Sequence, residues 1–145
     1  MNETKKTILF LCTGNSCRSQ MAEGWARHLK GEFFEVYSAG VETHGLNLNA
    51  VKVMAECGVD ISSHASKLVS DLKEKRFDFV VTVCDSAREK CPYYPAETRV
   101  IHKGFPDPPQ LAKNAETEEE ILYFYRKVRD EIREYILTLP ESLEV

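Results

Sequence analysis

Long apolar segments are missing from this sequence of 145 residues. The apolar run nearest to its start extends only from Ile8 to Leu11. A membrane-spanning helix needs about 20 apolar residues, and a secretory signal needs an apolar stretch of about 7 to 15 residues. We therefore expect neither a membrane span nor a signal peptide, and we expect a cytoplasmic protein.

Clusters of basic residues interleaved with aromatic residues are also missing. The chain has 19 Lys and Arg residues against 23 Asp and Glu residues, a net charge of −4. Short basic stretches at 5–6 and 73–76 are typical of solvated strand flanks. We expect no nucleic-acid partner.

Internal repeats and low-complexity tracts are absent as well. With 43% hydrophobic residues, a chain of this length is expected to form a single catalytic domain over residues 1–145 with an ordinary core. Because the helices expected below use their apolar faces for packing, we expect a monomer.

Closely spaced cysteine pairs of the C-x2-C kind, which zinc sites usually contain, do not occur. The sequence has five cysteines: Cys12, Cys17, Cys57, Cys84 and Cys91. Neither His64 nor His102 is grouped with them in a ligand pattern. An odd number of cysteines without an export signal also argues against a disulfide framework. The sequence therefore predicts no metal site and directs attention to reactive thiols.

Segments typical of strands alternate with segments of helical spacing. We expect strands at 5–11, 33–38, 77–83 and 98–102, with Ala39-Gly40 ending the second one. We expect helices at 19–30, 48–57, 67–75 and 117–139, and a turn of helix at 85–90. This alternation predicts an α/β protein with a small four-stranded parallel sheet and helices on both faces, a flavodoxin-like three-layer sandwich.

The last helix has the clearest start signal. Thr117 and Glu120 form a capping box. The apolar positions that follow at helical spacing are expected to face the core: Ile121, Phe124, Val128, Ile132, Tyr135, Ile136 and Leu139.

Residues 12–18 connect the first strand to the first helix and form the most informative stretch of the chain. Between Cys12 and Arg18 lie only small or hydrogen-bonding side chains and one glycine: Thr13, Gly14, Asn15, Ser16 and Cys17. Such a loop can curl with its backbone N–H groups inward, where they and the helix N-terminus bind a tetrahedral oxyanion. The residues that the anion would contact are therefore 13–18.

The same positive field is expected to hold Cys12 as a thiolate, which makes Cys12 the predicted nucleophile. Arg18 offers a planar fork of donors for two oxygens of the anion. Ser19 is expected to donate to the cysteine sulfur or to cap the helix. A strand-to-helix turn with a buried cysteine remains the alternative interpretation of this pattern.

Two further cysteines fit a thiol relay. Cys84 ends the third predicted strand and so opens onto the same sheet edge as Cys12. Cys84 can displace an adduct from Cys12, and Cys91 can then attack the resulting disulfide. If residues 85–91 are helical, Cys84 and Cys91 lie about 10 Å apart along the axis, whereas a disulfide needs Cα atoms within about 7 Å. The relay therefore predicts that this segment unwinds or bends; coincidental buried cysteines are the alternative.

Attack by a thiolate on a phosphoryl-like centre also needs an acid for the departing oxygen. Asp107 is the candidate, because it lies in the proline-stiffened segment 104–109 that follows the fourth predicted strand. A carboxyl beside a bound anion holds its proton longer than a free one. The other interpretation is that Asp-Pro only starts a turn.

Over essentially its whole length the sequence resembles the thioredoxin-coupled arsenate reductases of the low-molecular-weight tyrosine phosphatase family. The resemblance is carried by residues 12–25, by residues 38–45, by Cys84 with Cys91-Pro92, and by Asp107-Pro108. The phosphatases of the family share the first and last of these features but lack the Cys84/Cys91 pair. That pair discriminates between the two branches.

The resemblance implies the low-molecular-weight phosphatase fold and the reduction of arsenate to arsenite in arsenic detoxification. Cys12 would attack arsenic, Asp107 would protonate the leaving oxygen, and Cys84 would attack Cys12 and release arsenite. Cys91 would then close a surface-exposed disulfide that thioredoxin reduces. No bound redox cofactor is implied, and phosphate or sulfate would bind as analogues.

Some members of this family bind potassium beside the anion loop. Asn15, Glu23 and Ser38 match that site, but its other ligand positions are occupied by Ala65 and Lys67. We therefore predict that the potassium site is lost and that the Lys67 ammonium takes the place of the cation.

Two other functions stay open at this point. A low-molecular-weight tyrosine phosphatase would use Cys12, Arg18 and Asp107 without the relay, and a weak phosphatase side activity is expected in either case. A phosphate-binding or redox-sensing module would use the thiols as a switch.

Overall fold

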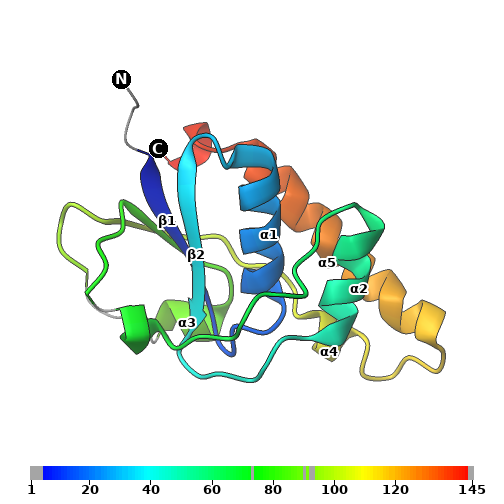
Figure 1. Ribbon diagram of the computed structural model, residues 1–145. Helices are drawn as coiled ribbons and strands as arrows, with labels where there is room; N and C mark the ends of the chain where they lie inside the picture. Colours follow the sequence, from blue (N-terminus) through cyan, green and yellow to red (C-terminus); the bar gives the residue numbers. More distant parts are fainter. Residues whose placement is uncertain (1–4, 73, 90, 92–93, 144–145) are drawn as a thin grey trace.

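The computed structural model describes residues 5–72, 74–89, 91 and 94–143 and is shown in Figure 1. Within these residues four parallel strands form one sheet in the order β2-β1-β3-β4. The strands are β1 (Lys6–Cys12), β2 (Phe34–Gly40), β3 (Phe79–Thr82) and β4 (Arg99–His102). The predicted α/β class with a four-stranded parallel sheet is confirmed.

Helices connect the strands and cover the sheet. The α-helices are α1 (Arg18–Lys30), α2 (Leu48–Glu56), α3 (Asp85–Glu89), α4 (Pro108–Leu111) and α5 (Glu118–Leu137). Two short 3₁₀ turns are η1 (Val69–Leu72) and η2 (Glu141–Leu143). Parallel crossovers are right-handed, and the connection through α1 runs towards β2 while the one through α3 runs towards β4. The two helices therefore lie on opposite faces of the sheet. In the described ranges no helix combines the length and apolar character needed to cross a membrane.

The core is built around β1, one of the two strands with neighbours on both sides. Residues 8–11 are fully buried, as expected for a strand covered on both faces. On one face α1 packs against β1, β2 and α5, and its buried Met21 and Trp25 lie at helical spacing as predicted. The Trp25 indole N–H donates to the carbonyl oxygen of Arg129 in α5 over 3.2 Å. The central strand is thereby held rigidly, with its C-terminal end at Cys12.

The second strand is longer than predicted. It continues through Ala39 to Gly40, because these two residues pair with Leu11 and Cys12 of β1. A Cβ atom on Gly40 would lie 2.7 Å from the Thr13 carbonyl oxygen. Glycine is therefore needed here for close backbone packing against the loop after β1.

Several other boundaries differ from the predictions. The helix expected at 67–75 is only the 3₁₀ turn η1, and none of its residues is fully buried. The third strand begins at Phe79, because the Asp78 carboxylate accepts from the Thr7 backbone N–H at 2.8 Å. The helix expected at 85–90 ends at Glu89, and residue 90 lies outside the described residues. The short helix α4, directly after Asp107, was not predicted.

Helix α5 begins as predicted, since the Thr117 hydroxyl accepts from the Glu120 backbone N–H at 3.1 Å. Its buried face is rotated near the start: Leu122 and Tyr125 are buried, whereas Ile121 and Phe124 are only half-buried. The positions Val128, Ile132 and Ile136 are buried as expected.

Candidate active site

The carboxyl ends of β1 and β3 bring two thiols into contact. Cys12 is the last residue of β1, and Cys84 follows β3 by two positions. Their side chains share a hydrogen bond. The Thr13 hydroxyl lies 3.1 Å from the Cys84 sulfur, and the Ala87 backbone N–H donates to the same sulfur at 3.4 Å. The geometry expected for the first exchange of a thiol relay is therefore present.

Hydrogen bonds to the Cys84 sulfur favour its thiolate form. Donation from the Cys12 S–H lowers the pKa of Cys84 to about 5, and the Thr13 hydroxyl and the Ala87 N–H act in the same direction. That shared hydrogen bond and burial raise the pKa of Cys12, although Arg18 and the Ser19 backbone N–H oppose the rise. The Cys12 thiolate stays a prediction, since Arg18 favours it and the hydrogen bond with Cys84 opposes it. Two interacting thiols titrate as a pair and not as separate groups.

An unusual backbone conformation shapes the loop between β1 and α1. Asn15 has a φ of 48°, the left-handed region that L residues rarely adopt. Its amide donates to the hydroxyls of Ser19 at 2.9 Å and Ser38 at 3.0 Å. Its side-chain oxygen accepts from the Gln20 amide at 3.1 Å and from the Lys67 backbone N–H at 2.7 Å. Asn15 is fully buried, so the surrounding structure fixes the loop before any anion binds.

Arg18 is held in place by the segment that follows β4. Its Nη1 donates to the Phe105 carbonyl oxygen at 3.0 Å, and its Nη2 lies 3.7 Å from Asp107 Oδ1. Among the described residues, Arg18 Nε is buried without a hydrogen-bond partner. A buried donor without a partner is costly unless a ligand accepts from it. The structure therefore places Asp107 beside Arg18 and leaves one guanidinium donor for an anion.

The surroundings of Cys17, Ser19 and Ser16 complete the description of the loop. Cys17 precedes α1 and makes no side-chain cap, and burial and the nearby Asp107 carboxylate raise its pKa. Ser19 lies inside α1 and does not cap it; its backbone N–H rather than its hydroxyl contacts Cys12. The Ser16 carbonyl oxygen accepts from the Asn47 backbone N–H at 3.0 Å.

The segment that follows β2 also contacts the loop between β1 and α1. The backbone N–H groups of Glu42 and His44 donate to the carbonyl oxygens of Thr13 and Gly14 at 2.9 and 3.0 Å. The His44 ring packs over Gly14, because a Cβ there would meet its Nδ1 at 2.3 Å. His44 was not among the predicted site residues. The only signal that pointed to it was the resemblance of residues 38–45, since its placement depends on a contact 30 positions away in the sequence.

Cys91 is separated from Cys84 by helix α3, and all five cysteines are free thiols. Burial raises the pKa of Cys91. Burial and the proximity of Cys91 together raise the pKa of Tyr94 to about 12, and the Tyr94 ring packs edge-on against Phe77 with centroids 6.5 Å apart. The expected Pro92 lies outside the described residues.

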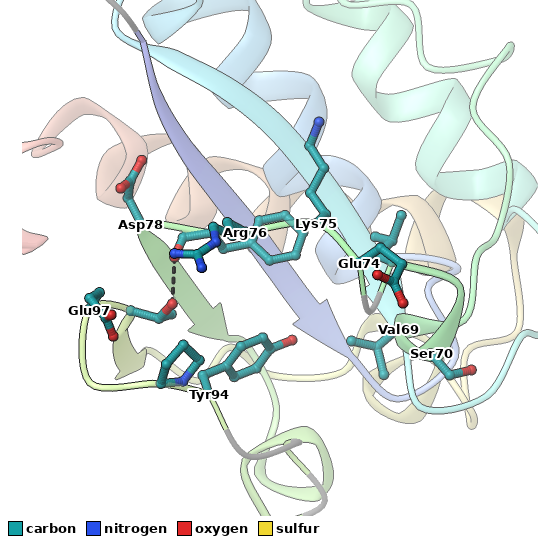
Figure 2. Close-up of a pocket in the computed structure, with 12 residues that line it drawn as sticks. Val69, Ser70, Glu74, Lys75, Arg76, Asp78, Tyr94 and Glu97 are labelled. Atoms are coloured by element: carbon teal, nitrogen blue, oxygen red, sulfur yellow. Dashed lines mark hydrogen bonds between the residues drawn. The ribbon is translucent and has the colours of Figure 1, made fainter.

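A cavity of about 540 Å³ lies beside Tyr94 and not at the anion loop. Its lining side chains come from η1, from the segment before β3 and from the segment before β4, as Figure 2 shows. In that view α1 lies behind the strands, so the cavity is on the opposite face of the sheet. None of the predicted site residues lines it.

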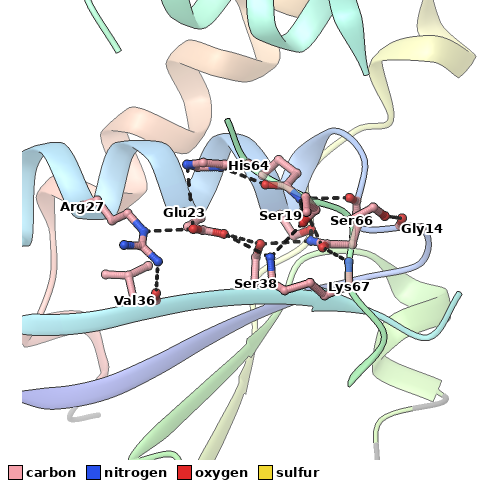
Figure 3. A network of polar contacts seen from close by, with 12 residues as sticks. Gly14, Ser19, Glu23, Arg27, Val36, Ser38, His64, Ser66 and Lys67 are labelled. Atoms are coloured by element: carbon pink, nitrogen blue, oxygen red, sulfur yellow. Dashed lines mark hydrogen bonds and ion pairs between the residues drawn. The ribbon is translucent and has the colours of Figure 1, made fainter. Parts of the chain in front are cut away.

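Behind the anion loop, the buried carboxylate of Glu23 is surrounded by donors (Figure 3). It accepts from Arg27 Nε at 2.9 Å and from the Ser38 hydroxyl at 2.5 Å. His64 Nε2 lies at 3.8 Å and Lys67 Nζ at 4.0 Å. Burial lowers the pKa of His64, which favours its neutral form.

These contacts leave little capacity for a further cation. Lys67 Nζ also donates to the Ala65 carbonyl oxygen at 2.9 Å, so the ammonium lies between the two oxygens that a cation would need. The residues present therefore fit a potassium ion poorly. The described part of the chain also contains no group of three or more His, Cys, Asp or Glu side chains that could hold a metal ion.

Comparisons with known proteins agree with this geometry. Residues 7–144 match the family described as low molecular weight phosphotyrosine protein phosphatase. An arsenate reductase of Bacillus licheniformis is 52% identical over 97% of this chain and 99% of its own length. A solved structure of an arsenate reductase in the phosphate binding state has a TM-score of 0.73 and 29% identity, covering 95% of this chain and 98% of that one. A thioredoxin-dependent arsenate reductase from Corynebacterium glutamicum has a TM-score of 0.70 and 25% identity, covering 99% of this chain and 64% of that one.

Proposed function

The chain belongs to the low molecular weight phosphotyrosine protein phosphatase family, and from this premise we propose that it is a thioredoxin-coupled arsenate reductase. The observation that carries the proposal is the contact between the Cys12 and Cys84 thiols. Hydrolysis of a phosphate ester needs a nucleophile, an arginine and an acid. Phosphate ester hydrolysis does not require a second reactive sulfur next to the nucleophile.

Arsenate binds in the loop formed by residues 13–17. The inward backbone N–H groups and the α1 N-terminus surround its oxygens, and the donor at Arg18 Nε, which has no protein partner among the described residues, completes the shell. Phosphate and sulfate share the shape and charge of arsenate and bind as analogues.

In the first step Cys12 passes its proton across the shared hydrogen bond to Cys84 and attacks arsenic. An S–As bond forms and an As–O bond breaks, and the departing oxygen leaves as water with a proton from Asp107. Arg18 follows the charge that develops on the remaining oxygens. The product is a covalent adduct on Cys12.

In the second step the Cys84 sulfur attacks the Cys12 sulfur. The new S–S bond replaces the S–As bond, and its electron pair goes to arsenic, which is reduced from arsenic(V) to arsenic(III). The proton held by Cys84 leaves with arsenite. Because the two thiols already lie close together, we expect this step to need much less movement than the next one.

The third step does need movement. Cys91 attacks Cys84 in the Cys12–Cys84 disulfide, which releases Cys12 and forms a Cys84–Cys91 disulfide. Helix α3 lies between the two cysteines and must unwind. Reduced thioredoxin then restores the two thiols; the relative from Corynebacterium glutamicum, which is described as thioredoxin-dependent, supports this partner. A cytoplasmic location agrees with it, because thiols are kept reduced there.

A phosphatase is the second candidate, favoured by the approach of Arg18 to Asp107 at 3.7 Å beside Cys12. We propose a weak hydrolysis of aryl phosphates as a side activity. It would survive replacement of either Cys84 or Cys91, whereas multiple turnover of arsenate would not.

We further propose that Lys67 serves in place of a potassium ion. Its ammonium lies 2.9 Å from the Ala65 carbonyl oxygen and 4.0 Å from Glu23. Potassium chloride is therefore expected to change the thermal midpoint and the turnover no more than sodium chloride does. A gain specific to potassium would contradict this assignment.

The proposed relay is tested by trapping its disulfides. Fully reduced protein is mixed with arsenate without thioredoxin, quenched with an alkylating reagent and analysed by mass spectrometry. The wild type is expected to end with a Cys84–Cys91 disulfide and Cys91→Ser with a Cys12–Cys84 disulfide. Cys57→Ser, on an exposed position, is the matched control and should behave as the wild type. Absence of any arsenate-dependent disulfide, together with rapid hydrolysis of aryl phosphate, would favour the phosphatase.

A further inference from the structure

The start of helix α3 is tied to the sheet by a chain of polar contacts that the proposed reaction does not use. The Thr82 hydroxyl at the end of β3 lies 2.8 Å from His102 Nδ1, and His102 Nε2 lies 3.2 Å from Asp85 Oδ1. Thr82 is almost fully buried, and His102 is partly buried. Asp85 is the first residue of α3 and directly follows Cys84.

The position of the histidine proton follows from these contacts. If Nδ1 carried the proton, the lone pair of Nε2 would face the Asp85 carboxylate, which repels it. A proton on Nε2, which lies 3.2 Å from Asp85 Oδ1, is therefore favoured, and Nδ1 shares its hydrogen bond with the Thr82 hydroxyl. A Cβ atom on Gly104 would lie 3.2 Å from Nε2, so glycine at that position leaves the ring room to reach Asp85.

Helix α3 depends on such external contacts. It has five residues, far fewer than the about 12 that an isolated helix needs to be even marginally stable in water. Three contacts of the described residues hold it closed: the buried Ala87 side chain, the Ala87 N–H on the Cys84 sulfur, and the Asp85–His102 pair. Of these, only the last holds the helix to β4.

We propose that His102 is a latch for the thiol relay: a positioning residue that holds α3 closed over reduced Cys84 and so controls how readily Cys91 reaches it. This inference rests on the relay proposed above. Thr82 orients the ring and Asp85 is the residue that the ring holds. When α3 unwinds for the third step, the Asp85–His102 contact breaks. The intact contact between Asp85 and His102 therefore slows formation of the Cys84–Cys91 disulfide and favours the reduced form of the protein at equilibrium.

The size of the effect follows from exposure. The Asp85 side chain is 88% exposed, so the pair contributes about as much as a surface ion pair. Its loss is expected to make opening of α3 and formation of the Cys84–Cys91 disulfide about two- to fivefold more favourable.

The test measures α3 directly in the reduced, full-length protein. Amide hydrogen exchange over residues 85–91 is compared between the wild type, His102→Phe and Asp85→Ala. Glu89→Ala is the matched control, since Glu89 is an exposed acid of the same helix without a partner among the described residues. Both latch variants should exchange about two- to fivefold faster in this segment and equally in α5. The double variant should exchange at the same rate as the single variants, because each single substitution already removes the same contact between His102 and Asp85.

A second measurement follows the thiols without arsenate. Diamide takes two electrons and two protons from the thiols, and the Cys84–Cys91 disulfide should form in the latch variants faster by the same factor. Asp85→Asn keeps an acceptor for the Nε2–H and should restore most of the wild-type rate. If His102→Phe and Asp85→Ala exchange and oxidise like Glu89→Ala, the latch is refuted. If they differ as expected while the wild type does not reduce arsenate, the latch stands and the proposed function fails.

Discussion

Gly40 is the position where a single methyl group most directly tests the account of the anion loop. A Cβ there would lie 2.4 Å from the Glu42 carbonyl oxygen, 2.7 Å from that of Thr13 and 2.8 Å from the Asn15 nitrogen. Unstrained contacts are about 3.5 Å, so these backbone atoms must separate by about 0.7 to 1.1 Å. Gly40→Ala therefore has to displace Thr13 and Asn15, which belong to the loop.

Two effects of Gly40→Ala can be given magnitudes. Forcing an extra carbon into a packed interior costs about 1–3 kcal/mol of the free energy of unfolding. A displacement of about 1 Å in a binding group lowers a catalytic rate about 100-fold. Urea unfolding measures the first effect. Isothermal titration with phosphate and the arsenate reduction rate measure the second.

Gly45→Ala provides the control for Gly40→Ala. Gly45 has a φ of +79°, and a Cβ added there would meet no atom within 4 Å beyond its chain neighbours. An alanine at this position should cost about 1–2 kcal/mol for its left-handed backbone and leave phosphate affinity unchanged. If Gly40→Ala bound phosphate with wild-type affinity, the close packing of β2 against the loop would not be what shapes the anion site.

Three further predictions concern other parts of the molecule. Asp107→Asn removes the proton donor and should slow adduct formation about 100-fold or more in single-turnover experiments while phosphate affinity stays nearly constant; an unchanged rate would exclude Asp107 as the acid. Cys12→Ala removes the donor that most lowers the pKa of Cys84. In the wild type the ultraviolet absorbance of the Cys84 thiolate is expected to be lost as the pH falls through about 5. In the variant it should be lost at a higher pH. A midpoint that does not move would mean that Cys12 does not share its proton. Thr117→Ala removes the cap at Glu120 and should lower the free energy of unfolding by about 1 kcal/mol without affecting catalysis, whereas a loss of activity would contradict a purely structural role.

Features set by local chemistry were predictable from the sequence. The buried run of residues 8–11, the face of α1 with Met21 and Trp25, and the cap at Thr117 all follow from neighbouring residues. The meeting of Cys12 and Cys84 was also predictable, because the carboxyl ends of parallel strands gather at one edge.

Features set by distant contacts were not predictable. Gly40 looks like a strand end in the sequence, and only the backbone of residues 13–15 explains why glycine is needed within the strand. The lowered pKa of Cys84 depends on three donors, from Cys12, Thr13 and Ala87. The first two lie at the end of the neighbouring strand β1, far away in the sequence. The segment 67–75 has helical spacing, but its described residues form only a 3₁₀ turn, in which Val69 and Leu72 pack against the core without being fully buried.

The most direct test of the central claim is arsenate-dependent NADPH consumption with thioredoxin and thioredoxin reductase, comparing the wild type with Cys91→Ser. The wild type should show steady turnover and the variant a single turnover. Equal rates would remove Cys91 from the relay. No arsenate-dependent consumption by either protein, together with rapid hydrolysis of aryl phosphate, would contradict the assignment as an arsenate reductase.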